Sequence, residues 1–269
     1  MSIRYQMPRL GTRKLYHMLN HDLSREGIKI GRDGLFDLLR EENMLIMRKK
    51  RYTKTTNSNH WMQKYPNRVK GLVPKYPESL WVADITYILI KNGHGYLHLI
   101  TDAYSKKIMG YCLSDNLSAV STNKALKMAL KNKQYHHSMI HHSDRGLQYC
   151  SALYIKTLAD KDILISMTED GSPYDNAIAE RVNGILKDEF GMDDRFENLV
   201  EAEYQLHQSV NLYNNKRPHM SNSLLTPNEM HQQNCILPKS WHKKSRRTFK
   251  GSSAFLPTLQ KDQKPVNLF

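Results

Sequence analysis

The chain has 269 residues, with 40 Lys plus Arg against 26 Asp plus Glu, a formal net charge of +14 and a mean hydropathy of −0.65. Such a charge excess favours a polyanionic partner. The sequence has no run of 18 apolar residues, no apolar signal-peptide core and no CxxC spacing among its three cysteines, which argues against a membrane span, export, a disulfide framework and a cysteine-rich zinc site.

Residues 1–47 are basic and contain two predicted helices. Apolar side chains recur at helical spacing within residues 9–20 and 32–44. This pair is compatible with a helix-turn-helix DNA-binding segment, in which Arg13 and Lys14 would contact phosphates. It is equally compatible with an ordinary amphipathic helix pair that binds no DNA, since charge blocks at the ends of a chain can simply be solvated.

Residues 48–77 are basic, polar and interrupted by Pro66, Pro74 and Pro77. No long periodic element fits this composition, so we expect an exposed basic linker.

An α/β domain follows the predicted linker. Short runs rich in β-branched and aromatic residues alternate with stretches of helical periodicity. We expect strands over residues 80–90, 94–104, 106–114, 137–143 and 163–167, and helices over 117–131, 151–161 and 175–190. This order predicts a mixed sheet with helices packed on it, and Asp175 is the expected cap of the last helix.

Three acidic residues stand out in this domain. Asp84 lies among apolar residues in the middle of the first strand, where a charge is costly without a partner or a metal. Asp144 follows the fourth strand, and Glu180 lies in the first turns of the last helix. Each also has an ordinary role available: a solvated strand face for Asp84, a turn for Asp144 and a helix-dipole contact for Glu180.

Two strands of one sheet, with one helix packed on that sheet, can bring these three carboxylates together. Three gathered carboxylates can hold two divalent ions, which neither a lone acid nor a helix cap can do. Bound metal ions would also relieve the repulsion among the three negative charges.

Several motifs in chain order resemble the transposases encoded by the second reading frame of insertion sequence family three, within the retroviral-integrase superfamily. The motifs are WVADITYI, TDAYSKKIMGY, HHSDRGLQY, SMTEDGSPYDNAIAERVNGILKDE, YNNKRPHMSN and, after the core, LLTPNEMH. The resemblance covers nearly the whole chain. It implies an RNase-H-like mixed five-stranded sheet with flanking helices, preceded by a small helical, helix-turn-helix-like segment.

The resemblance also implies a division of the chain and a set of site residues. The divisions are a basic helical DNA-binding segment (1–47), a basic linker (48–77), a catalytic core with C-terminal helices (78–235) and a basic tail (236–269). The implied catalytic and metal-binding triad is Asp84, Asp144 and Glu180. We expect DNA contacts from Lys187, Arg181, Lys216 and Arg217, in addition to Arg13 and Lys14. His219 and Asn215 either line the same groove or close a helix end.

The implied chemistry is cleavage and joining of DNA with two Mg²⁺ ions, for which Mn²⁺ can substitute. Attack by water gives a nick, and attack by a DNA 3′-hydroxyl gives strand transfer. The expected partners are element-end and target DNA, further copies of this chain on DNA, and an upstream-frame protein or frameshift fusion. We expect a cytoplasmic, nucleoid-associated bacterial protein. The competing hypotheses are a structure-selective nuclease of the same fold and an inactive DNA-binding relative.

Some features depart from the family pattern or compete with the triad. The tail carries an additional basic run after Trp241, which leaves its role in DNA binding open. Asp170 and Asp175 lie close to Glu180 in sequence, but the family pattern selects Glu180. Asp102 matches a family position, and we expect it to have a structural role at a strand end.

Overall fold

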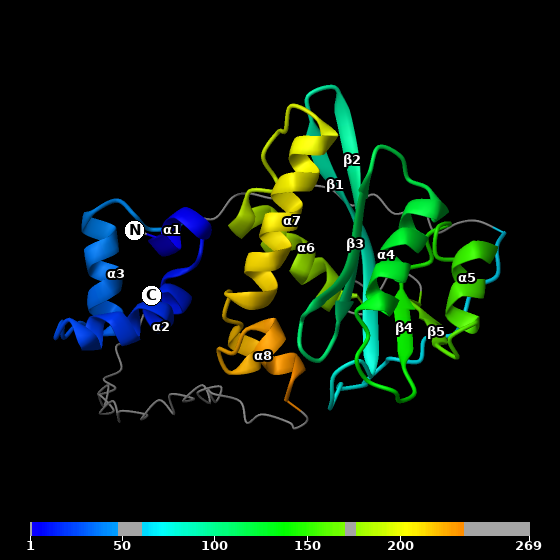
Figure 1. Cartoon of the computed structure of the whole chain (residues 1–269), viewed down its shortest axis with the longest axis horizontal. Helices are drawn as coiled ribbons and strands as arrows, with labels where there is room; N and C mark the ends of the chain where they lie inside the picture. The colour runs from blue at the N-terminus through cyan, green and yellow to red at the C-terminus, as the bar shows by residue number, and fades with distance from the viewer. Residues whose placement is uncertain (1, 48–60, 170–175, 234–269) are drawn as a thin grey trace, which may run out of the picture.

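A computed structural model of the protein describes residues 2–47, 61–169 and 176–233 (Figure 1). A group of three helices comes first, a five-stranded sheet with two helices follows, and further helices complete the chain. The elements in chain order are α1 (Ser2–Gln6), α2 (Thr12–Arg25), α3 (Arg32–Glu41), β1 (Leu80–Ile90), β2 (Gly93–Asp102), β3 (Ile108–Ser114), α4 (Ala119–Lys131), β4 (Ile140–Ser143), α5 (Ala152–Ala159), β5 (Leu164–Met167), α6 (Ala177–Phe190), α7 (Leu199–Asn215), the 3₁₀ turn η1 (Met220–Asn222) and α8 (Pro227–His231).

The five strands form one mixed sheet in the order β3-β2-β1-β4-β5. β1 pairs antiparallel with β2, as β2 does with β3, while the β1–β4 and β4–β5 pairs are parallel. The predicted mixed α/β sheet is therefore confirmed, with each expected strand present and its ends shifted by a few residues at most. α1 was not expected from the sequence.

Helices cover both faces of the sheet. α4 and α5 lie against one face, and α6 and α7 lie against the other (Figure 1). Two apolar clusters fill these layers. One joins Trp81 and Met109 of the sheet to Leu126 of α4, and the other joins Ile88 of β1 to Ile185 of α6. Polar groups between sheet and helix are therefore surrounded by apolar packing.

Alternation along β1 decides which layer Asp84 faces. Successive side chains of a strand point to opposite faces. Trp81 and Ala83 pack in the cluster of α4 and α5, whereas Val82 packs with Ala179 of α6. Asp84 has the same parity as Val82, so its side chain points toward α6.

The three N-terminal helices pack on the core through α6 and α7. Leu15 of α2 and Leu35 of α3 are buried in the same apolar cluster as Ile185. Lys14 of α2 adds an ion pair of 2.8 Å from Nζ to an oxygen of Glu189 on α6. The helix pair expected from the sequence is present, and whether it binds DNA stays a prediction.

A buried group of charges fixes α8 to the sheet. His231 of α8 lies 3.2 Å from Glu78 and 3.7 Å from Asp102, measured from its ring nitrogens to the carboxylate oxygens. Asp102 also accepts hydrogen bonds from the backbone N–H groups of Glu78 and Ser105. Hydrogen bonds to both carboxylates raise the pKa of His231 despite its burial. The structural role expected of Asp102 is confirmed.

The boundaries of the predicted linker and tail stay predictions. Residues 61–77 contain no helix or strand, while residues 48–60 and the whole predicted tail, 236–269, lie outside the described residues. Within the described ranges, no helix has the length and apolar character needed to cross a membrane.

Gly110 permits the close packing of β3 on α4, which gives a first prediction. A Cβ at this position would lie 2.2 Å from the backbone oxygen of Ala125 and 2.6 Å from the backbone nitrogen of Ala129. We expect Gly110→Ala to lower the free energy of unfolding by about 2 kcal/mol or more, because two backbone segments must separate. Urea denaturation measures this loss.

Gly11→Ala is the matched control. Gly11 precedes α2 with a φ of −65°, and nothing lies within 4 Å of its added Cβ. A loss at Gly110 no larger than the change at Gly11 would contradict the packing described for β3 and α4.

Candidate active site

Asp84 and Asp144 lie side by side because β1 and β4 are parallel neighbours. The register pairs Val82 with His142. Continued by two residues, it places Asp84 opposite Asp144, which directly follows β4. Adjacent strands are about 5 Å apart, so these two carboxylates lie near each other where β4 ends, in the interior of the sheet.

The start of α6 brings Glu180 near these two carboxylates, close enough for its charge to act on Asp84. The Asn176 side-chain amide donates a 3.0 Å hydrogen bond to the backbone oxygen of Ala83, the residue before Asp84. This bond fixes the beginning of the helix over β1, and Glu180 follows one turn later with an exposed side chain. Asn176 stands at the N-terminal end of α6, and its amide binds the strand and makes no cap hydrogen bond. Whether Asp175 caps the helix stays a prediction. Asp170 and Asp175 lie outside the described residues.

Asn183 holds Asp84, a contact that the sequence reasoning missed. Its side-chain amide donates a 2.8 Å hydrogen bond to Asp84 Oδ2. Asn183 is only 4% exposed, and its Oδ1 has no hydrogen-bond partner among the described residues. A signal was present in the sequence, because Asn183 lies three residues after Glu180 and so shares its helix face.

The gathered charges change the acidity of Asp84. Burial, the negative charge of Asp144 and, to a smaller extent, that of Glu180 raise the pKa of Asp84 to about 7, although the hydrogen bond from Asn183 acts in the opposite direction. The pKa of the buried Tyr149 phenol is also raised well above 10, by burial and then by Asp144. Negative charge is therefore concentrated in this region.

The donor set fits an oxygen-seeking divalent cation. In the described part of the chain, no three His, Cys, Asp or Glu side chains are close enough to form a finished metal cluster. The available donors are nonetheless the carboxylates of Asp84, Asp144 and Glu180 and the unpartnered Oδ1 of Asn183, all hard oxygens. A cation would offset the repulsion that raises the pKa of Asp84.

Four of the predicted DNA-contact residues are half-buried or exposed. Arg181 is exposed beside Glu180, and Lys187 is half-buried two helical turns beyond Glu180. Lys216 is exposed and donates a hydrogen bond to Gln6 of α1. Arg13 is exposed on α2.

Arg217 and Lys14 have a different place from the one expected. Arg217 is 1% exposed, and its guanidinium binds both carboxylate oxygens of Glu189, at 2.7 and 2.8 Å. Lys14 binds the same carboxylate. The prediction that Arg217 contacts DNA directly is at odds with this burial, and we assign it to holding α6, α2 and the end of α7 together.

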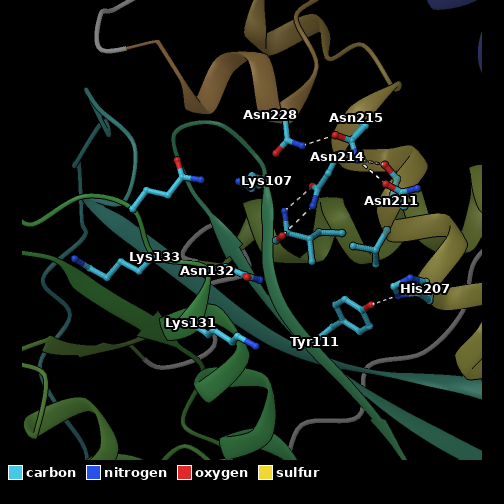
Figure 2. Close-up of a pocket in the computed structure, with 13 residues that line it drawn as sticks. Lys107, Tyr111, Lys131, Asn132, Lys133, His207, Asn211, Asn214, Asn215 and Asn228 are labelled. Atoms are coloured by element: carbon cyan, nitrogen blue, oxygen red, sulfur yellow. Dashed lines mark hydrogen bonds between the residues drawn. The ribbon is translucent and has the colours of Figure 1, made fainter.

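His219 and Asn215 do not share a groove. His219 is 6% exposed and lines a cavity of about 290 Å³ together with Arg181 and Ala177. Asn215 lines a separate hollow of about 630 Å³ and hydrogen-bonds Asn211 and Asn228 (Figure 2).

That larger hollow lies apart from the carboxylates. Figure 2 shows Lys131 and Lys133 on the side opposite Asn211 and Asn215. Its wall includes lysines, asparagines and one histidine but no carboxylate among the described residues. A metal-dependent phosphoryl transfer needs carboxylate ligands, and this hollow offers none among the described residues. The candidate active site is therefore the group of carboxylates around Asp84.

Comparison with known proteins agrees with this geometry. Two models of the integrase core domain match residues 74–173 and 161–227. The 31 kDa protein of insertion element IS600 from Shigella sonnei is 34% identical over 231 residues, which cover 84% of this chain and 85% of that protein. The transposase for insertion sequence element IS629, also from Shigella sonnei, is 30% identical over 207 residues, which cover 77% of this chain and 68% of that protein.

One solved structure shares the fold. A chain of the simian T-cell lymphotropic virus intasome, in complex with PP2A regulatory subunit B56 gamma, aligns with a TM-score of 0.52 at 18% identity. The alignment covers 87% of this chain and 79% of that chain. At this identity the likeness shows the fold alone.

The raised pKa of Asp84 predicts a pH-dependent stability. Aspartate in an unfolded chain has a pKa near 3.9, so between about pH 4 and 7 the folded protein holds a proton that the unfolded chain has lost. This contribution to stability disappears as the pH rises through 7. In metal-free buffer at pH 8, we expect the free energy of unfolding of Asp84→Asn to exceed that of the wild type by about 2 kcal/mol. This is half the energy that corresponds to the whole pKa shift, because the carboxyl is only half-buried and solvent screens part of the effect.

Urea denaturation at pH 8 and at pH 4 measures this difference. The gain should become small at pH 4, where the folded carboxyl is protonated and that of the unfolded chain is about half protonated. Asp160→Asn, at an exposed position after α5, should show no such trend. An equal gain at both pH values would contradict the charge repulsion described here.

Proposed function

The chain belongs to the insertion-sequence transposases that carry an integrase core domain, and we propose that its catalytic centre is formed by Asp84, Asp144 and Glu180. The protein is an enzyme of the polynucleotidyl transferase class that acts in insertion-sequence transposition. The competing nuclease and inactive-relative hypotheses are not favoured by its relatives.

The observation that carries the proposed centre is the gathering of three carboxylates in one region, where β4 ends and α6 begins. Asp84 and Asp144 meet through the parallel register, and the Asn176 hydrogen bond places the start of α6 above them. The raised pKa of Asp84 reflects its burial and the nearness of the other two charges. A fold gains no stability from such an arrangement, so a functional reason for it is required.

Divalent metal dependence follows from this donor set. We propose two Mg²⁺ ions, replaceable by Mn²⁺, held by Asp84, Asp144 and Glu180. When bound, such ions activate the attacking oxygen and stabilise the leaving oxygen of an in-line displacement at phosphorus. Asn183 keeps Asp84 in position through its 2.8 Å hydrogen bond. Asp84 must lose its proton before it can ligate a cation, which makes binding stronger as the pH rises toward 8.

The substrates and partners we propose are DNA and further copies of the chain. Element-end and target DNA would contact Arg181, Lys187, Lys216 and Arg13 through phosphates, which carry no sequence information directly. Attack by water nicks the strand, and attack by a 3′-hydroxyl joins two strands. We also propose assembly as a homo-oligomer on DNA, cooperation with an upstream-frame protein or fusion, and a cytoplasmic, nucleoid-associated location.

Metal-dependent cleavage on a plasmid with candidate element ends tests the proposed centre. We expect the wild type to nick and join strands only with Mg²⁺ or Mn²⁺. Asp144→Asn and Glu180→Gln should each lower both rates by about a hundredfold or more, because several kcal/mol of transition-state stabilisation depend on metal held by these groups. Gel shift should show DNA binding retained.

Asp160→Asn, directly after α5, and Glu203→Gln, on α7, are matched controls at exposed positions. Full activity in either active-site variant would move the catalytic centre elsewhere. If the wild type binds DNA without cutting, the assay is repeated with the upstream-frame protein, and continued inactivity would contradict catalysis by this chain.

A further inference from the structure

A cavity of about 290 Å³ lies where α2, α6 and the segment after α7 meet. Its walls are largely apolar, with Ile178, Val182, Ile185 and Met220 among them. Apolar walls lower the local dielectric and strengthen any charge interaction inside.

Four cationic side chains line this cavity, which we call the cationic cavity: Lys14, Lys106, Arg181 and Arg217. No carboxylate is among the described residues that line it. Two carboxylates act on these cations from outside the lining. Glu189 is shared by Lys14 and Arg217, and the charge of Asp102 acts on Lys106. The four cationic side chains therefore outnumber the carboxylates near them.

His219 supplies an unused hydrogen-bonding atom in the same cavity. The side chain is 6% exposed, and its Nε2 has no partner in the described part of the chain. Its ring is held edge-on by Tyr213, with 5.1 Å between ring centroids. A buried imidazole nitrogen without a partner is costly unless a ligand completes its hydrogen bonding.

The pKa values of three basic groups in the lining are lowered, by burial and in two of them also by neighbouring positive charges. Burial and then the Arg217 charge lower the pKa of Lys14 to about 8, and burial lowers that of Lys106 to about 8. The pKa of His219 is lowered well below 6.5 by burial and by the charges of Arg217, Lys14, Lys106 and Arg181. An anion in the cavity would offset the part of these shifts that the neighbouring positive charges cause in Lys14 and His219.

We propose that the cationic cavity binds a phosphate group of the DNA backbone, with His219 donating from Nε2 and with Lys106 and Arg181 providing charge. The volume leaves room for a phosphodiester together with its sugar. Ala177 and Ile178 line the cavity one turn or less before Glu180, so the bound strand lies next to the carboxylates. Lys14 belongs to the N-terminal helices, so a bound phosphate also links these helices to the core. This inference rests on the proposed function, because it takes DNA as the ligand.

Competitive acylation of lysines tests the site without any need for cleavage. The full chain is labelled with an acetylating reagent at pH 8 in metal-free buffer, with and without a saturating DNA duplex, and the rates are read by mass spectrometry. We expect DNA to slow the labelling of Lys106 by about fivefold or more, since phosphate binding raises its proton affinity and covers it. Lys156, exposed on α5, should change by less than about twofold.

Two further ligands distinguish the source of the anion. Inorganic phosphate at high concentration should protect Lys106 weakly, in the same direction as DNA. Protection by inorganic phosphate but not by saturating DNA would overturn the proposal, as would equal protection by a polyglutamate peptide. Unchanged labelling of Lys106 with DNA bound would also overturn it.

Binding variants give an independent measurement. Lys106→Gln should weaken DNA binding about tenfold at low salt and reduce the slope of log Kd against log salt by about one, as expected when one phosphate contact is lost. His219→Gln, checked by circular dichroism for folding, should also weaken binding. Lys156→Gln should leave affinity and slope unchanged.

The outcome separates this inference from the proposed catalysis. Protection of Lys106 in a chain that never nicks DNA would support the cavity and contradict the catalytic proposal. Wild-type affinity and salt slope in Lys106→Gln, in a chain that nicks normally, would contradict the cavity and leave the catalytic centre intact.

Discussion

The repulsion among Asp84, Asp144 and Glu180 is the constraint around which the rest of the domain is arranged. A parallel strand pair brings the first two together, and a helix tied to β1 through Asn176 adds the third. The free energy that this grouping costs must come from elsewhere, and the apolar layers on both faces of the sheet provide it. In the proposed centre, a bound metal ion would offset this repulsion, so the same grouping that costs stability would favour cation binding.

α6 connects the proposed catalytic centre to the proposed phosphate site. One end of the helix carries Glu180 and Asn183 beside Asp84, and the other carries Glu189, which binds Arg217 and Lys14. The N-terminal helices are thereby packed against the same helix that completes the carboxylate group. The cationic cavity lies along this helix between the two ends, where a DNA phosphate would contact both parts of the protein.

The sequence predicts the strands well and points to Asp84, Asp144 and Glu180 as the proposed triad, because those signals are local. A charged Asp84 inside an apolar strand and an acid directly after a strand are visible in a few residues, and the motif order adds the family. The partners of these groups are not local. Glu189 pairs with Arg217 across 28 residues and with Lys14 across 175, so the sequence indicates exposed DNA contacts where the fold makes a buried ion pair. Asn183 was missed because a polar residue within an apolar helix stripe has no visible partner in the sequence.

Proton release on metal binding tests the central claim most directly. Mg²⁺ or Mn²⁺ is titrated calorimetrically into the DNA-bound wild type and into DNA-bound Glu180→Gln at pH 6. Repeating the titration in buffers of different ionisation enthalpy gives the number of protons released for each cation bound. Because Asp84 has a pKa of about 7, the wild type should release close to one proton as the cation replaces it, and Glu180→Gln should bind more weakly and release fewer. Metal binding of equal strength in both proteins without proton release would place the metal away from Asp84 and contradict this account.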